Sequence, residues 1–177
     1  MTEPMTGPMT DSVTRVALVP GCLALLPEYA SLHDPVAELR AACLAAVAWL
    51  GEDVRIVAGA QGARVATSLL AEVGASAVGS GAAAHLIVGN GSARRSEKAP
   101  GHLDPRAAAF DEALAASLAK PDVESLSALD LGLADELWAD VGPIVDSADL
   151  LRTAATVAVD YDDDPYGVRY WVARWTV

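Results

Sequence analysis

The segment LIVGNGSARRSEKAPGHLDPR, residues 86–106, decides how the chain is organised. A short apolar run leads into a turn with Gly89 and Gly91, a basic loop follows, and Asp104-Pro105 marks the start of a helix. This order predicts a strand, a loop and a helix. In an open α/β sheet, such loops follow the carboxyl ends of the strands, where ligands bind.

The segments before this stretch predict parallel strands. Residues 13–19 are rich in β-branched side chains, and residues 54–58 form a second run of that kind. Between them, residues 35–50 carry apolar side chains at steps of three and four, behind a cap at Asp34, as in an amphipathic helix. A strand, helix and strand of these lengths predict parallel pairing, with residues 85–88 as the third strand. Residues 63–84 combine helical spacing with several glycines, so helix and loop both stay open there.

The segments after this stretch predict a layer of helices and a closing β-hairpin. Helices are expected over residues 104–119, 121–129, 130–138 and 146–153, and strands over 156–161 and 168–175. Trp171 and Trp175 share one face of the last strand and are expected to pack in a core or a subunit contact. The sequence therefore predicts a single α/β domain over residues 13–177, with a mixed, mostly parallel sheet flanked by helices. Residues 1–12, with their repeated Met and Thr, are expected to be a disordered leader.

Composition excludes several classes of partner. The 177-residue chain has 24 acidic and 12 basic residues and a net charge of −12, which disfavours nucleic acid and acidic membranes. Its two cysteines are too few for a disulfide framework or a cysteine-based zinc site. No apolar run is long enough for a membrane span, and no basic region precedes an apolar block at the start. We therefore expect a cytoplasmic protein, either monomeric or a homo-oligomer.

Several short motifs resemble one protein family. They are ALVP at residues 17–20, GNGSARR at 89–95, KAPG at 98–101, DPRA at 104–107, PYGV at 165–168 and YWVARW at 170–175. Together they are similar to short actinobacterial proteins classed with the B-type domain of class III extradiol ring-cleavage dioxygenases, over nearly the whole chain. The resemblance implies a class III extradiol dioxygenase-like fold of this B type. In active members it implies a ferrous iron held by two histidines and one carboxylate.

The histidine positions of active relatives have other residues here. In those relatives, iron-binding histidines follow the first and second strands, where this chain has Gly21-Cys22 and Gly59 to Gln61. The histidines of the chain, His33, His85 and His102, lie elsewhere. The resemblance therefore implies a protein without the iron centre, with no metal ligand and no cofactor, that acts as a non-catalytic binding or assembly protein.

Other functions stay open. The chain could be an Fe(II)-dependent dioxygenase with relocated ligands, such as Glu28, His33 and His102. It could also be a metal-free enzyme that uses Cys22, His102 and Arg94, or an accessory subunit of another enzyme.

The candidate pocket lies at the carboxyl ends of the predicted strands. Its residues are Cys22, Gln61, Asn90, Ser92, Arg94, Arg95 and His102. They suit a small acidic or aromatic ligand, because an amide and a hydroxyl form hydrogen bonds and arginine binds carboxylate in a bidentate fork. Alternatively, residues 89–95 form a tight turn whose arginines are solvated or paired with the surplus acid. The aspartates of residues 160–164 lack the Gly and distal Glu of a calcium loop, which favours a solvated acidic turn.

Overall fold

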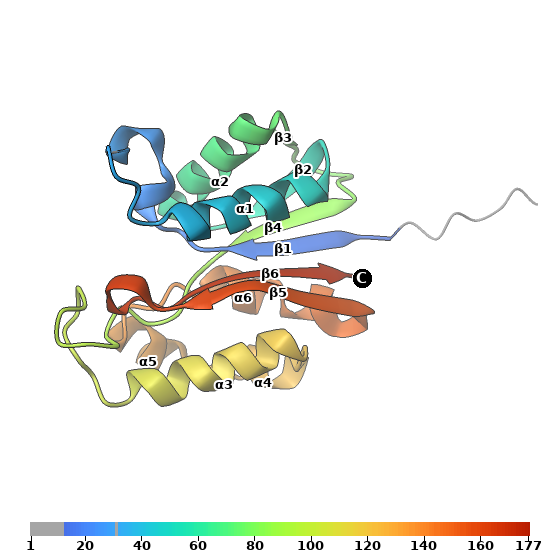
Figure 1. The fold of residues 1–177 in the computed structure, drawn as a ribbon. Helices are drawn as coiled ribbons and strands as arrows, with labels where there is room; N and C mark the ends of the chain where they lie inside the picture. The colour runs from blue at the N-terminus through green and yellow to red at the C-terminus, as the bar shows by residue number, and fades with distance from the viewer. Residues whose placement is uncertain (1–12, 31) are drawn as a thin grey trace, which may run out of the picture.

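A six-stranded mixed sheet lies between two layers of helices in the computed structural model, which describes residues 13–30 and 32–177 (Figure 1). The strand order is β3-β2-β4-β1-β6-β5. β1 to β4 pair in parallel, and the last two strands join antiparallel beside β1. The prediction of a single α/β domain with a mixed sheet is confirmed. The predicted leader, residues 1–12, lies outside the described residues.

The first half of the chain forms the parallel strands and one helix layer. Its elements are β1 (Arg15–Val19), the 3-10 helices η1 (Leu23–Leu25) and η2 (Pro27–Tyr29), α1 (Ala37–Leu50), β2 (Asp53–Val57), α2 (Ala60–Val73), β3 (Ser76–Ala77) and β4 (Ala84–Val88). α1 begins two residues later than predicted, because Asp34 accepts a hydrogen bond from the Val36 N–H in a turn before the helix. Residues 63–84, for which the sequence allows both helix and loop, form most of α2 and the short β3. α2 ends at Gly74, which has a φ of 76°.

The second half forms the other helix layer and the hairpin. Its elements are α3 (Ala107–Ala119), α4 (Val123–Ser127), α5 (Leu131–Glu136), α6 (Gly142–Asp146), η3 (Ala148–Thr153), β5 (Thr156–Asp163), η4 (Pro165–Gly167) and β6 (Tyr170–Thr176). Asp122 and Asp130 cap α4 and α5 through their side chains. The helix predicted over residues 146–153 is present as the 3-10 helix η3, so its place is right and its type differs from an α-helix. The short α-helix α6 precedes it and is not predicted.

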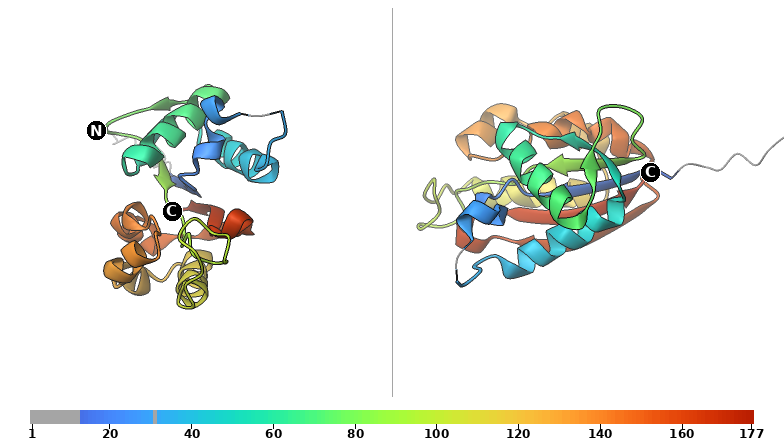
Figure 2. Two further views of the ribbon diagram at one scale, coloured as in Figure 1. Left: turned by 90° about the vertical axis from the view of Figure 1, so that its left-hand side faces the viewer. Right: turned by 90° about the horizontal axis from the view of Figure 1, so that it is seen from above.

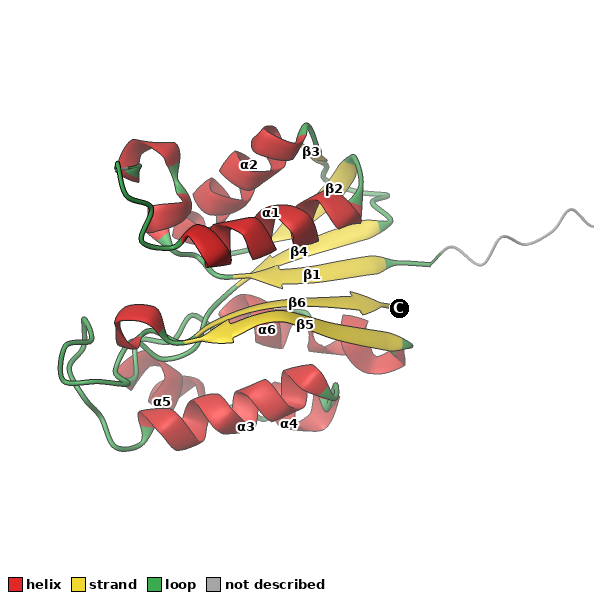
Figure 3. Cartoon of the chain, viewed as in Figure 1, coloured by secondary structure: helices red, strands yellow, loops and turns green. Residues whose placement is uncertain are grey.

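The two helix layers enclose separate apolar cores. α1 and α2 cover one face of the sheet and α3 to α6 the other, as the end-on view in Figure 2 shows. Trp171 and Trp175 are buried in the second core, which confirms their predicted packing, and the Trp175 indole N–H donates to the Leu118 carbonyl. No helix within the described residues is long and apolar enough to cross a membrane. The carboxyl ends of β1 and β4 finish beside the long irregular loop of residues 89–106 (Figure 3).

Candidate functional site

Three segments that carry predicted site residues lie where the parallel strands end. Chain segments at Gly21, Gln61 and Asn90 follow β1, β2 and β4. The Gln61 side-chain amide donates to the Gly21 carbonyl oxygen at 2.8 Å. A Cβ atom on Gly21 would lie 3.8 Å from Asn90 Oδ1, so the end of β1 and the end of β4 are in close contact. The structure therefore brings Gln61 and Asn90 together around Gly21.

Glycine lets the start of α2 approach β4 closely. A Cβ atom on Gly62 would lie 2.9 Å from the Val88 side chain. α2 has no side-chain cap and no acidic residue in its first turn. Its free N–H groups therefore leave positive partial charge at this end of the sheet.

Cys22 lies on the α1 side of the sheet. Cys22 is half-buried, and burial, followed by the nearby Cys22, raises the pKa of the Tyr170 hydroxyl. Cys43 is fully buried under α1, and burial raises the pKa of its thiol. Both cysteines are free thiols.

Ser92 and Arg95 contact a buried carboxylate that the sequence interpretation missed. Asp111 on α3 is fully buried and accepts hydrogen bonds from the Ser92 N–H at 2.8 Å and the Ser92 hydroxyl at 2.6 Å. The Arg95 guanidinium donates to Asp111 at 3.3 Å and to Asp164 at 2.6 Å. Burial raises the pKa of Asp111, although the Ser92 hydrogen bonds and the Arg95 charge act against this. This network ties the loop to α3 and to the turn after β5.

Arg94 belongs to a second, more exposed network. Its guanidinium donates to the Glu136 carbonyl at 2.9 Å and lies 3.9 Å from the Asp104 carboxylate. Arg106 bridges Asp104 at 2.8 Å and the Glu136 carboxylate at 2.7 Å. The two loop arginines therefore pair with acidic groups of the chain itself.

The Asp104 network predicts a pH effect on stability. Hydrogen bonds from the side chain and backbone of Arg106 hold the pKa of Asp104 at about 2, against its ordinary 3.8. The unfolded chain therefore binds this proton more readily between these two pH values, so the stabilisation is present above pH 3.8 and is lost as the pH falls toward 2. We expect the stability difference between the wild type and Asp104→Asn to shrink over this window. Urea unfolding of both proteins at a series of pH values measures it, and a constant difference would contradict the assignment.

The acidic run after Val159 is exposed at Asp160, Asp162 and Asp163, as the sequence favours, but it lies mostly on β5 and its carboxylates pair with arginines. Asp160 forms two hydrogen bonds with Arg174, at 2.6 and 2.8 Å. Asp162 pairs with Arg169, and Asp164 pairs with Arg95. The sequence does not predict these pairs because the arginines come from β6, from the residue just before β6 and from the loop after β4.

The histidines lie apart. His33 and His102 are exposed, and His85 is half-buried at the start of β4, where burial and then the charge of Arg55 lower its pKa. Across residues 13–30 and 32–177, no three His, Cys, Asp or Glu side chains are grouped so that they could hold a metal ion. Glu28, which the relocated iron site would use, instead pairs with Arg64 at 2.9 Å.

The strand ends do not fit the iron that the resemblance implies. That ligand set needs two imidazoles and a carboxylate on one face of the metal. The ends of β1, β2 and β4 present Cys22, Gln61 and Asn90 instead.

An open groove adjoins the strand ends on the α2 side. It has a volume of about 570 Å³ and lies between α2 and the segment Leu26 to Glu28, at the start of η2. Its lining is largely apolar, with an ion pair on the rim: Leu26, Pro27, Glu28, Ala63, Arg64, Thr67, Ser68 and Ala71. The first lining residue on one wall, Leu26, lies four residues after Cys22 in the sequence. The first on the other wall, Ala63, lies two residues after Gln61. The sequence interpretation missed this groove because its α2 wall lies where the sequence allows both helix and loop.

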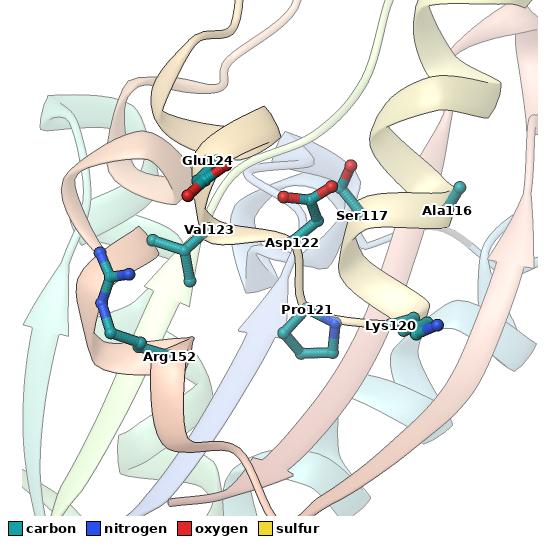
Figure 4. Close-up of a pocket in the computed structure, with 8 residues that line it drawn as sticks. All are labelled: Ala116, Ser117, Lys120, Pro121, Asp122, Val123, Glu124 and Arg152. Carbon is teal, nitrogen blue, oxygen red and sulfur yellow. The ribbon is translucent and has the colours of Figure 1, made fainter.

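A second pocket lies among the helices of the other layer. It has a volume of about 470 Å³ and lies between the end of α3, the start of α4 and η3 (Figure 4). Lys120 and Arg152 stand on opposite flanks of Pro121 and Val123, while Asp122 and Glu124 supply compensating carboxylates. Because its lining carries both basic and acidic side chains, this pocket favours neither anions nor cations.

Comparison of the chain with protein-family models, with curated proteins and with solved structures finds no match. The geometry of the site is therefore the basis for the function proposed below.

Proposed function

We propose that this chain is a non-catalytic binding protein on a class III extradiol dioxygenase-like scaffold, and that it binds a small aromatic carboxylate. The observation that carries the proposal is the groove between η2 and α2, beside the strand ends. Ligand sites are concave and mostly apolar, with a few polar groups that fix orientation. This groove has apolar walls and one guanidinium, that of Arg64, on its rim.

Arg64 is suited to receive the ligand's carboxylate. Its side chain is 59% exposed, and its present partner, Glu28, is 53% exposed, so the pair is loosely held. A ligand carboxylate would displace Glu28 and form a bidentate pair with the guanidinium. The ring would then lie against the apolar wall formed by Leu26, Pro27 and Ala71.

Benzoate and its neutral analogue benzamide test this proposal. We expect benzoate to bind and benzamide to bind more weakly, as measured by calorimetry or by ligand-observed NMR. Arg64→Gln should weaken benzoate binding by about tenfold, the loss expected for one charge-assisted hydrogen-bonding pair. Adding Fe(II) should leave the benzoate affinity unchanged and should produce no ring cleavage of catechols.

Arg152→Gln is the matched control. Arg152 is 60% exposed and pairs with one exposed carboxylate, Asp149, as Arg64 pairs with Glu28. Its replacement should leave benzoate binding unchanged. Equal losses in both variants, or no benzoate binding by the wild type, would refute the proposal. Iron-dependent ring cleavage would support the rival dioxygenase.

A further inference from the structure

The groove beside α2 continues into a second hollow. This hollow has a volume of about 580 Å³ and is lined by Pro27, Arg40, Ser68, Ala71 and Glu72. Pro27, Ser68 and Ala71 also line the groove itself. The two hollows are therefore one continuous trough. We call the part with Arg64 its near half and the part with Arg40 and Glu72 its far half.

Helix geometry gives the trough its direction and length. Arg64, Ser68 and Glu72 are four residues apart along α2, so they are neighbours in one row on the helix surface. With a rise of about 1.5 Å per residue, the stretch of α2 from Arg64 to Glu72 spans about 12 Å. Benzoate, a single ring with a carboxylate, is shorter than this and would leave the far half unfilled.

The wall opposite α2 is held in place by Arg40. The Arg40 guanidinium, which extends from α1, donates to the Asp34 carboxylate at 2.7 Å and to the carbonyls of Leu25 and Ala24 at 2.8 and 2.6 Å. These bonds fix the segment that leads into the wall. The trough is therefore preformed, and a ligand loses little free energy by ordering it.

The far half suits a neutral, apolar group. Each nitrogen of the Arg40 guanidinium already has an acceptor, so Arg40 is poorly placed to bind a further anion. The other charged residue in the lining, Glu72, is exposed and acidic. A second carboxylate on a ligand would meet Glu72 in a chain of net charge −12, and the two negative charges would repel.

We propose that the ligand is an aromatic monocarboxylic acid with an extended apolar substituent opposite its carboxylate, an inference that rests on the function proposed above. The carboxylate binds Arg64 in the near half. The substituent lies between Pro27 and the part of α2 that carries Ser68 and Ala71, and it ends beside Glu72. Dicarboxylic acids of the same length are disfavoured by Glu72.

Calorimetry with benzoate and 4-butylbenzoate tests the length of the ligand. 4-Butylbenzoate should bind about tenfold more tightly, because the open trough buries about half of the surface of four added carbon atoms. Arg64→Gln should weaken both ligands by the same factor, because both use the same carboxylate contact. In NMR spectra, NOEs should connect the butyl protons with the Ala71 methyl group.

A dicarboxylic acid tests the far end of the trough. 4-(3-Carboxypropyl)benzoate, which is about as long as 4-butylbenzoate, should bind the wild type about tenfold more weakly than 4-butylbenzoate. In Glu72→Arg the diacid should gain about fivefold or more, because a repulsion is replaced by an attraction. Benzoate should bind this variant as it binds the wild type. Arginine near the end of α2 also suits the helix dipole, so the fold should be kept.

Glu124→Arg is the matched control. It makes the same change of charge in the pocket of the other helix layer, at an exposed residue of α4. The affinity for the diacid should change by less than about twofold, since exposed charges more than a Debye length apart are largely screened.

The outcomes separate this inference from the proposed function. If neither benzoate nor 4-butylbenzoate binds through Arg64, the proposed function fails, and this inference fails with it. If benzoate binds through Arg64 but 4-butylbenzoate binds no more tightly, the inference alone is refuted. Equal gains of the diacid in Glu72→Arg and Glu124→Arg would also refute it, because the substituent would then not reach Glu72.

Discussion

Replacing Asp111 by alanine is expected to lower the free energy of unfolding by about 3–5 kcal/mol, the cost of breaking a buried ion pair by removing one partner. The fully buried carboxylate accepts hydrogen bonds from the backbone and hydroxyl of Ser92 and from Arg95. Alanine would leave the Ser92 donors unpaired and the Arg95 guanidinium, which is 15% exposed, with only Asp164. Urea unfolding followed by tryptophan fluorescence measures the loss.

Asp149→Ala is the control for this variant. Asp149 pairs with Arg152, but its side chain is 84% exposed. Its removal should change stability by no more than about 0.5 kcal/mol. If Asp111→Ala cost as little as this control, Asp111 would not be the group that holds the loop.

Gly91→Ala is expected to cost about 3 kcal/mol through overpacking. A Cβ atom on Gly91 would lie 2.5 Å from Asp111 Oδ1, 2.7 Å from the Trp171 ring and 2.8 Å from Arg169 Cβ. These neighbours belong to α3, to β6 and to the segment just before β6, so the added methyl group would have to push apart the loop, the helix and the sheet. Urea unfolding gives the change in stability, and the amide NMR shifts of Ser92 and Asp111 should report the displacement.

Gly142→Ala is the same chemical change in open space. Among the described residues, apart from its chain neighbours and the backbone of its own helix, no atom lies within 4 Å of a Cβ atom on Gly142, and the residue opens α6. Alanine should be neutral there or stabilise the protein by up to about 1 kcal/mol, because it favours the helix and restricts the unfolded chain. If Gly91→Ala and Gly142→Ala changed the free energy of unfolding equally, the close neighbours of Gly91 would not be the source of a stability cost.

Local patterns in the sequence predict the elements of the fold well. The spacing of apolar residues in α1 and the turn residues between β5 and β6 act over a few neighbours, so a single sequence reveals them. α2 is ambiguous in the sequence because its helical spacing runs into glycines, one of which, Gly74, ends the helix in a left-handed conformation. The sequence also does not distinguish the α-helix α6 from the 3-10 helix η3 over residues 142–153, because helical turns this short have similar local sequence patterns.

The candidate site is predicted less completely, because its pairings are long-range. Ser92 and Arg95 are predicted to bind a ligand, but they contact Asp111 and Asp164, which lie 19 and 69 residues further along the chain. One local signal is available: Asp111 interrupts the apolar face of α3, directly after Phe110 and three residues before Leu114. A carboxylate on such a face must find a partner when it is buried, and the basic loop before α3 is a nearby source of one.

The position of β6 constrains how this chain can be made. The last strand in the sequence lies inside the sheet, between β1 and β5. Ribosomes add residues from the amino end, so β1 and its row of unpaired backbone groups must wait until β6 leaves the exit tunnel. Until then the nascent four-stranded sheet has an open edge at β1. Chaperones that shield such edges should raise the yield of folded protein most when translation is slow.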